Sequence, residues 1–104
     1  MSPSFQLSPQ AVEDIDEIWW FISQDDLNAA NRVEGEIVAA CRSLALHPLM
    51  GIRRPDITSL PVRFWTLPRY PNYVIVYRPG TDPLQVIAVL HGRRDLARAL
   101  KERK

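Results

Sequence analysis

The sequence has little cysteine, histidine and glycine, and each shortage excludes a class of site. Cys41 is the one cysteine among 104 residues, so the chain forms no internal disulfide, which fits a reducing compartment such as the cytoplasm. The two histidines, His47 and His91, stand far from Cys41 and from each other in sequence and show no metal-ligand spacing. Gly51 is one of only four glycines and indicates a turn rather than a phosphate-binding loop. We therefore expect no metal and no cofactor.

Long apolar runs are also missing. No stretch approaches the roughly 20 residues that a membrane-spanning helix needs, so we expect no membrane partner. The opening residues MSPSFQLSP lack a basic region followed by an apolar one, and we expect no signal peptide. With 46% hydrophobic residues, the length suits a single domain over residues 1–104.

Charge is distributed unevenly although the net charge is only +1. Residues 1–52 hold two arginines and eight acids, whereas residues 53–104 hold eleven basic residues and four acids. The first half is thus acidic and the second half basic. Such asymmetry is consistent with an anionic partner for the second half, or with the two halves pairing on the surface.

Hydrophobic spacing predicts two helices after a short strand at residues 5–7. Ser8 and Pro9 suit the N-cap and first position of a helix over Gln10–Gln24. A second apolar stripe of helical period predicts a helix from Ala29 to Ala45, ended by His47-Pro48. With a brief connection, these helices should form an antiparallel hairpin.

The second half predicts strands. After an irregular stretch at 48–61, strand patterns cover Val62–Leu67, Tyr73–Arg78 and Leu84–His91, with short turn-rich connections. Asp95 is a candidate cap for a last helix, Leu96–Glu102. The expected fold is α+β, in the order β-α-α-β-β-β with a C-terminal α, and the helix hairpin packs on one face of a small antiparallel twisted sheet.

Both faces of this sheet should be apolar. In Tyr73–Arg78, alternation sends Tyr73, Ile75 and Tyr77 to one side and the valines between them to the other. Because the hairpin can cover only one face, we expect the other face to receive a second polypeptide.

Arginine supplies the strongest functional signal. Five of these residues lie on or beside the predicted strands, and in a meander their backbones can converge within one sheet width: Arg63, Arg69, Arg78, Arg93 and Arg94. Guanidinium groups bind phosphates or carboxylates through paired hydrogen bonds. The structural alternative is pairing with Asp14, Asp16 and Glu17 of the first helix.

Other chemistry-bearing residues have simpler interpretations. Cys41 lies on the core stripe of the second helix, and His47 is interpreted as a helix-end residue. Trp19-Trp20-Phe21 spans more than one helix face, so one side enters the core and the other is boundary packing or a partner surface. Metal-free RNA cleavage would need a base and an acid beside the cations, and His91 is the one histidine near the arginines.

Several blocks of sequence, taken in order, resemble the RelE/ParE superfamily of toxins from type II toxin–antitoxin modules, the ParE branch most. The opening Ala11–Ile18 is similar to the family pattern A-x-x-D-[LI]-x-x-I, and Pro48–Gly51 to P-x-x-G. Arg63 and Tyr73–Arg78 are similar to the R and Y-x-[IV]-x-Y-R blocks, and Val89–Asp95 to the ParE-type ending V-x-H-x-R-R-D.

The resemblance implies a toxin that inhibits DNA gyrase by binding, arrests growth, and is neutralised by a cognate ParD-like antitoxin in a toxin–antitoxin hetero-oligomer. From the arginine positions and the family blocks together, we predict these partner-binding residues: Arg63, Arg69, Tyr73, Tyr77, Arg78, His91, Arg93 and Arg94.

Two alternatives stay open at this point. RelE-type relatives are ribosome-dependent mRNA endonucleases, for which Arg63, Arg78, His91 and Arg94 would be the catalytic candidates. The proton-transfer tyrosine of that branch has no counterpart in this tail, where its place falls near Leu100. The other alternative is a non-toxic remnant that only binds its antitoxin.

Overall fold

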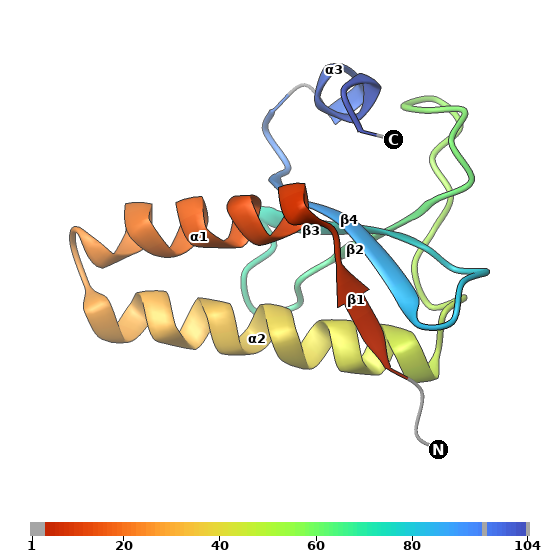
Figure 1. The fold of residues 1–104 in the computed structure, drawn as a ribbon. Coiled ribbons are helices and arrows are strands. Elements are labelled where there is room, and N and C mark those ends of the chain that lie inside the picture. The colour runs from red at the N-terminus through yellow and green to blue at the C-terminus, as the bar shows by residue number, and fades with distance from the viewer. Residues whose placement is uncertain (1–3, 95, 104) are drawn as a thin grey trace.

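The computed structural model describes residues 4–94 and 96–103, and the expected element order is confirmed. The elements are β1 (Phe5–Leu7), α1 (Pro9–Ser23), α2 (Leu27–Leu46), β2 (Arg63–Thr66), β3 (Tyr73–Arg78), β4 (Leu84–His91) and α3 (Leu96–Lys101). Figure 1 shows α1 and α2 side by side on one side of the sheet and α3 on the other. The cap expected at Asp95 lies outside the described residues.

Local sequence explains where the two long helices begin. The Ser8 side chain accepts a hydrogen bond from the Ala11 amide at 3.1 Å, and Pro9 occupies the first helical turn as expected. Asp26 caps α2 in the same way through the Ala29 amide at 3.0 Å, so α2 begins two residues before the predicted start. The connection between the helices is short, which holds them as an antiparallel hairpin.

The four strands form one sheet in the order β1-β4-β3-β2. The meander β2-β3-β4 is antiparallel as predicted, with Arg63 opposite Tyr77 and Tyr73 opposite His91. β1 pairs parallel with β4, so the sheet is mixed rather than wholly antiparallel.

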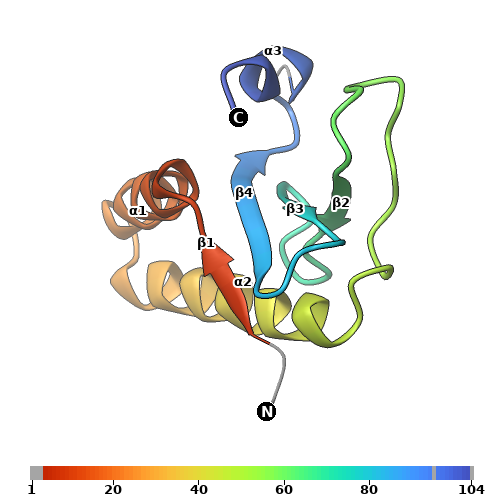
Figure 2. The same ribbon diagram turned by 45° about the vertical axis from the view of Figure 1, so that its right-hand side comes forward.

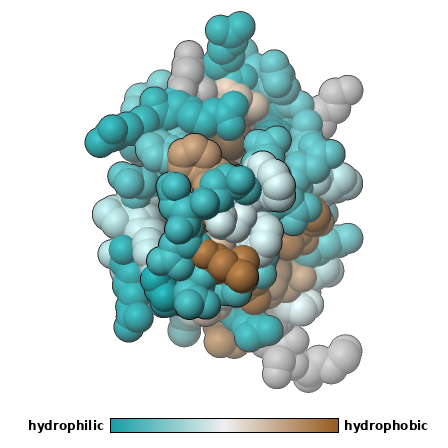
Figure 3. Space-filling model, turned by 90° about the vertical axis from the view of Figure 1, so that its left-hand side faces the viewer, coloured by the Kyte–Doolittle hydropathy of each residue, from teal (hydrophilic) through white to brown (hydrophobic). Residues whose placement is uncertain are grey.

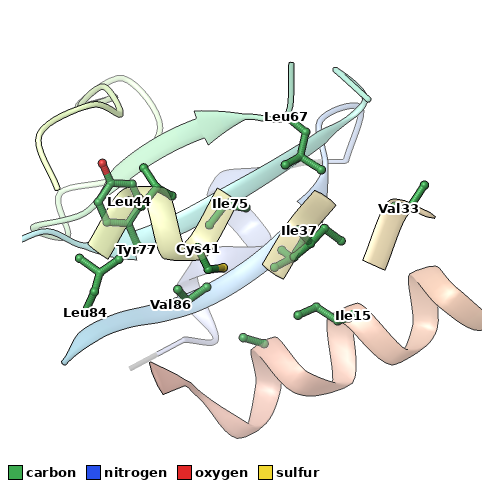
Figure 4. Packing of buried hydrophobic residues seen from close by; sticks show 12 residues of the cluster. Ile15, Val33, Ile37, Cys41, Leu44, Leu67, Ile75, Tyr77, Leu84 and Val86 are labelled. Atoms are coloured by element: carbon green, nitrogen blue, oxygen red, sulfur yellow. The ribbon is translucent and has the colours of Figure 1, made fainter. Parts of the chain in front are cut away.

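The hairpin covers the first face of the sheet. Ile37, Cys41 and Leu44 of α2 are completely buried against Ile75 and Tyr77 of β3. Figure 4 shows these side chains interleaved with Val86 of β4 and Ile15 of α1. The predicted apolar stripe of the second helix and the core position of Cys41 are therefore confirmed.

The second face is not bare, and the expectation that it waits for another chain is wrong. Val74 and Val76 do face away from the hairpin, as the alternation predicted. They are covered by Leu100 of α3, which is 1% exposed, and by Ile57 and Leu60 of the irregular segment before β2. Figure 2 shows this segment, in green, and α3 on the side of the sheet away from the hairpin. The chain uses its own irregular segment and C-terminus to remove this apolar surface from water.

A β-bulge in β4 decides which residues at the end of that strand face the hairpin. The register shifts between Val76 and Tyr77, which pair with Ala88 and Val86 and leave Ile87 as the extra residue. Ile87 and Ala88 both join the core of the second face, and Val89 returns to the hairpin side. The bulge thereby puts His91 on the same face as α1. Within the described residues, no helix is long and apolar enough to cross a membrane.

Candidate functional site

His91 ends β4, and its side chain contacts Tyr73 of β3. The two residues are directly opposite in the β3–β4 pair, and their rings meet edge to face with centroids 5.6 Å apart. A tight turn follows, in which the imidazole Nδ1 accepts a hydrogen bond from the Arg93 amide at 3.2 Å and the His91 carbonyl accepts one from the Arg94 amide at 3.0 Å.

A groove of about 490 Å³ lies between this end of the sheet and one face of α1, a size within the range of ligand pockets. We call it the His91 groove. The residues of α1 at its wall follow helical spacing, and the opposite wall comes from β3, β4 and the turn after β4. Its lining is Asp14, Glu17, Ile18, Phe21, Asn72, Tyr73, Val89, His91 and Arg94.

Asp14 lines this groove, is 8% exposed and forms a buried ion pair with Arg103. Its carboxylate accepts two hydrogen bonds from the Arg103 guanidinium, each 2.9 Å, and one from the Val89 amide at 3.0 Å. Arg103 also donates to the Ile87 carbonyl at 2.8 Å. The pair satisfies backbone groups of β4 beyond the end of β1, where that edge has no partner strand.

At the opposite end of the sheet, Tyr77 and Arg63 form hydrogen bonds with the segment before β2. Tyr77 is 0% exposed, donates its hydroxyl proton to the Pro48 carbonyl at 2.7 Å and accepts from the Gly51 amide at 2.9 Å. Burial raises the pKa of Tyr77, and the Gly51 amide and the Arg63 charge partly offset this rise. Arg63 donates to the Gly51 carbonyl at 2.7 Å. The bulky phenol explains the glycine, because a Cβ at position 51 would lie 2.6 Å from the Tyr77 hydroxyl.

The five arginines therefore do not converge, contrary to the expectation from their positions in the sequence. Arg63 and Arg78 lie at the Tyr77 end of the meander, whereas Arg69, Arg93 and Arg94 lie at the His91 end. The four residue steps from Tyr73 to Tyr77 alone separate these ends by about 13 Å. Of the four residues considered for RNA cleavage, only His91 and Arg94 line one groove.

The alternative, that these arginines pair with acids of the first helix, is wrong for Asp14, whose partner is Arg103. Arg69 forms a loose surface pair with Glu36 at 3.5 Å. Among the described residues, Arg78, Arg93 and Arg94 form no side-chain ion pair. Arg93 and Arg94 are both exposed, and Arg94 lines the His91 groove, where its charge is open to a partner.

Two of the eight residues predicted to bind a partner differ sharply in position. Tyr77 is fully buried and holds the segment from Pro48 to Gly51, so its role here is internal. Tyr73 is partly exposed and lines the groove, where burial raises the pKa of its phenol. Sequence reasoning gave both the same role because they lie on one strand and one face.

Sequence reasoning missed the α1 wall of the groove. Glu17 was considered only as an ion-pair partner, and Ile18 and Phe21 as helix-face residues. A signal was present in the stripe of residues 14, 17, 18 and 21, which share one helix face and mix carboxylates with apolar groups. The bulge in β4 decides that this helix face lies opposite His91.

The remaining chemical groups offer little reactivity. Across residues 4–94 and 96–103, no group of three or more histidines, cysteines or carboxylates is placed to hold a metal ion. Burial raises the pKa of the Cys41 thiol from 9.0 to about 12, so the thiol stays protonated. Trp19 donates its indole N–H to Asn31 at 2.9 Å, whereas Trp20 is 66% and Phe21 74% exposed, which excludes boundary packing for these two.

Comparison with known proteins places this geometry in context. A family model described as "ParE toxin of type II toxin-antitoxin system, parDE" matches residues 5–96. A solved structure titled "Chromosomal ParDE TA system from P. aeruginosa" superposes with a TM-score of 0.68 at 22% sequence identity, covering 86% of this chain and 96% of that one. A search of curated proteins gave no match. At this identity, the solved structure supports the fold alone.

Proposed function

Because the chain belongs to the ParE toxin family of type II toxin–antitoxin systems, we propose that it is a toxin that inhibits DNA gyrase by binding, and that an antitoxin encoded beside it neutralises it in the cytoplasm. The family match over residues 5–96 carries this proposal. The resemblance of Val89–Asp95 to the ParE-type ending adds support, since this stretch forms one wall of the His91 groove.

The His91 groove is the proposed docking site of the antitoxin. It offers apolar contacts through Ile18 and Phe21, a ring pair in Tyr73 and His91, and the exposed guanidinium of Arg94. Such a groove suits an apolar anchor side chain followed by an acidic residue, because a guanidinium binds a carboxylate through paired hydrogen bonds. Tyr77 and Arg63 lie at the other end of the sheet and do not belong to this site.

Ribonuclease activity is the second candidate, and one observation favours it. Glu17, Tyr73, His91 and Arg94 line the same groove, and together they supply the base, acid and cation that metal-free RNA cleavage needs. The surrounding charge argues against RNA as a ligand. The exposed carboxylate of Glu17 lines the same groove as Arg94 and repels phosphates.

Inducible expression with and without the product of the neighbouring reading frame tests the proposal. We expect expression alone to block DNA replication and induce the SOS response while messenger RNA stays intact, and co-expression to restore growth. Arrest with intact replication and cuts in translated messages would instead identify a ribonuclease. Normal growth despite soluble, folded protein would identify a non-toxic remnant.

Purified proteins test the docking site separately. We expect the antitoxin to bind Arg94→Glu at least tenfold more weakly than wild type, as measured by calorimetry, since one charged hydrogen bond contributes about 1.5–3 kcal/mol. Arg78→Glu at the far end of the sheet is the matched control and should bind as wild type does. Equal weakening by both substitutions would show that overall charge, not the groove, drives association.

A further inference from the structure

Three large apolar side chains project from the tip of the helix hairpin. Trp20 is 66% exposed, Phe21 74% and Leu27 56%, and we call these three residues the hairpin tip. Figure 3 looks onto the side of the molecule where the hairpin connection lies, and brown hydrophobic surface appears there amid teal hydrophilic surface. Exposed tryptophan and phenylalanine are typical of the residues that dominate binding at protein interfaces.

The fold itself makes no use of these side chains. The core contacts of the hairpin come from Ile15, Ile18 and Ile22 of α1, which face the sheet and α2. The neighbouring Trp19 turns toward α2 and bonds Asn31, so the helices pack without Trp20. Polar residues at the tip would leave the core unchanged, and the apolar surface is exposed at a cost in solubility.

The tip is held in a defined position. The Trp20 carbonyl accepts hydrogen bonds from the Ser23 hydroxyl at 2.8 Å and from the Gln24 side-chain Nε2 at 3.1 Å. Asp26 caps α2 immediately beyond. Because little ordering is needed on binding, a rigid tip loses less conformational entropy in a complex than a mobile loop does.

Charge around the tip selects the kind of partner. Residues 16–26 contain four acids, all of them exposed, and no lysine or arginine: Asp16, Glu17, Asp25 and Asp26. Electrostatic complementarity therefore requires a cationic partner surface with an apolar recess. Grooves that hold single-stranded or duplex nucleic acid have this character, because basic side chains contact phosphates and apolar or aromatic groups contact bases.

We propose that the hairpin tip enters the nucleic-acid-binding groove of the protein that the toxin acts on, with Trp20 and Phe21 in the place of bases and the surrounding carboxylates in the place of phosphates. The inference rests on the proposed function, since it needs a target that handles nucleic acid. It assigns target binding to the tip and antitoxin binding to the His91 groove, and Phe21 belongs to both because it also lines the groove.

The decisive variant is Trp20→Ser/Leu27→Ser, because neither residue lines the His91 groove. Both side chains are exposed, so we expect an unchanged melting temperature and unchanged antitoxin binding. Half-inhibition of gyrase supercoiling should require at least tenfold more of this variant than of wild type. The control is Leu49→Ser/Ile52→Ser, which removes comparably exposed apolar groups (69% and 58%) next to Arg53 rather than acids, and should inhibit as wild type does.

Competition tests the mimicry itself. Binding of the wild-type chain to gyrase should weaken at least tenfold when short duplex DNA saturates the enzyme, and should weaken with rising potassium chloride. Asp16→Asn/Asp25→Asn should reduce this salt dependence, whereas Asp82→Asn, an exposed acid far from the tip in sequence, should leave it unchanged. Binding indifferent to DNA and to salt would overturn the proposal.

Growth separates this inference from the proposed function. If wild type arrests growth but leaves gyrase active, gyrase is the wrong target, and the tip is then judged from growth alone. Relief of arrest by Trp20→Ser/Leu27→Ser but not by Leu49→Ser/Ile52→Ser supports the inference. Arrest by the tip variant equal to that of wild type overturns it whatever the target, and a wild-type chain that arrests nothing overturns both proposals.

Discussion

The two ends of the sheet contain the same kinds of residue and use them differently. At one end, the Tyr77 hydroxyl and the Arg63 guanidinium bond the backbone of the segment from Pro48 to Gly51. At the other end, Tyr73 faces His91 across an open groove and Arg94 stands exposed at its rim. Residue type and strand position are thus insufficient to assign a role, because the covering segment decides whether a tyrosine or arginine is satisfied internally.

The largest expected effect comes from breaking the ion pair that holds the His91 end. Asp14→Asn leaves the charge of Arg103, 11% exposed, without its partner, and we expect a loss of about 3–5 kcal/mol in the free energy of unfolding, measured by urea denaturation. Asp56→Asn breaks the exposed pair with Arg54 and should leave the midpoint unchanged. Similar midpoints for the two variants would mean that the buried pair does not hold this end.

Removing one hydroxyl from each tyrosine compares the two ends directly. Tyr77→Phe leaves the buried Gly51 amide and the Pro48 carbonyl unpaired and should cost about 1–3 kcal/mol of unfolding free energy. Tyr73→Phe should change stability by less than about 0.5 kcal/mol, because its phenol is partly exposed. Equal losses in thermal unfolding would contradict the distinction between an anchored end and an open end.

Gly51→Ala tests the anchored end from the backbone side. A Cβ there would lie 2.9 Å from the Phe64 carbonyl oxygen as well as close to the Tyr77 ring, so the segment must shift. We expect a loss of about 1–3 kcal/mol of unfolding free energy, as for other overpacked sites. Gly35→Ala is the control, because no atom lies within 4 Å of a Cβ at that position, and a helical alanine should stabilise slightly. Tolerance of both substitutions would show that the close approach to Tyr77 is not required.

The smallest effect concerns pH and the core that both ends share. The pKa of the Cys41 thiol is 9.0 when exposed and about 12 when buried, so its contribution is complete below pH 9 and declines as the pH rises toward 12. By pH 10 we expect a loss of about 1 kcal/mol relative to pH 8. Urea titrations at pH 8 and pH 10 measure the free energy of unfolding at each pH. Cys41→Ala should lack this part of the pH dependence, and an identical pH dependence in the variant and the wild type would place the thiol in contact with water.

Sequence reasoning did best where a residue's neighbours in the chain decide the outcome. The Ser8-Pro9 helix start, the apolar stripe through Ile37 and Cys41, and the three meander strands follow from capping chemistry and from periods of 3.6 and 2. The candidate site was predicted in part. Tyr73, His91 and Arg94 do line one groove, but Arg63, Arg78 and Tyr77 belong to the other end.

The sequence by itself determined the elements, the α+β class and the family likeness, because each is written in short-range patterns. Only the tertiary structure decided that Arg103 pairs with Asp14 across 89 positions, that β1 runs parallel to β4, and that α3 covers the second face. These outcomes depend on which distant surfaces meet, and neither spacing nor composition encodes that. The bulge at Ile87 shows the reason most simply, since one extra residue turns His91 toward α1 and so creates the groove.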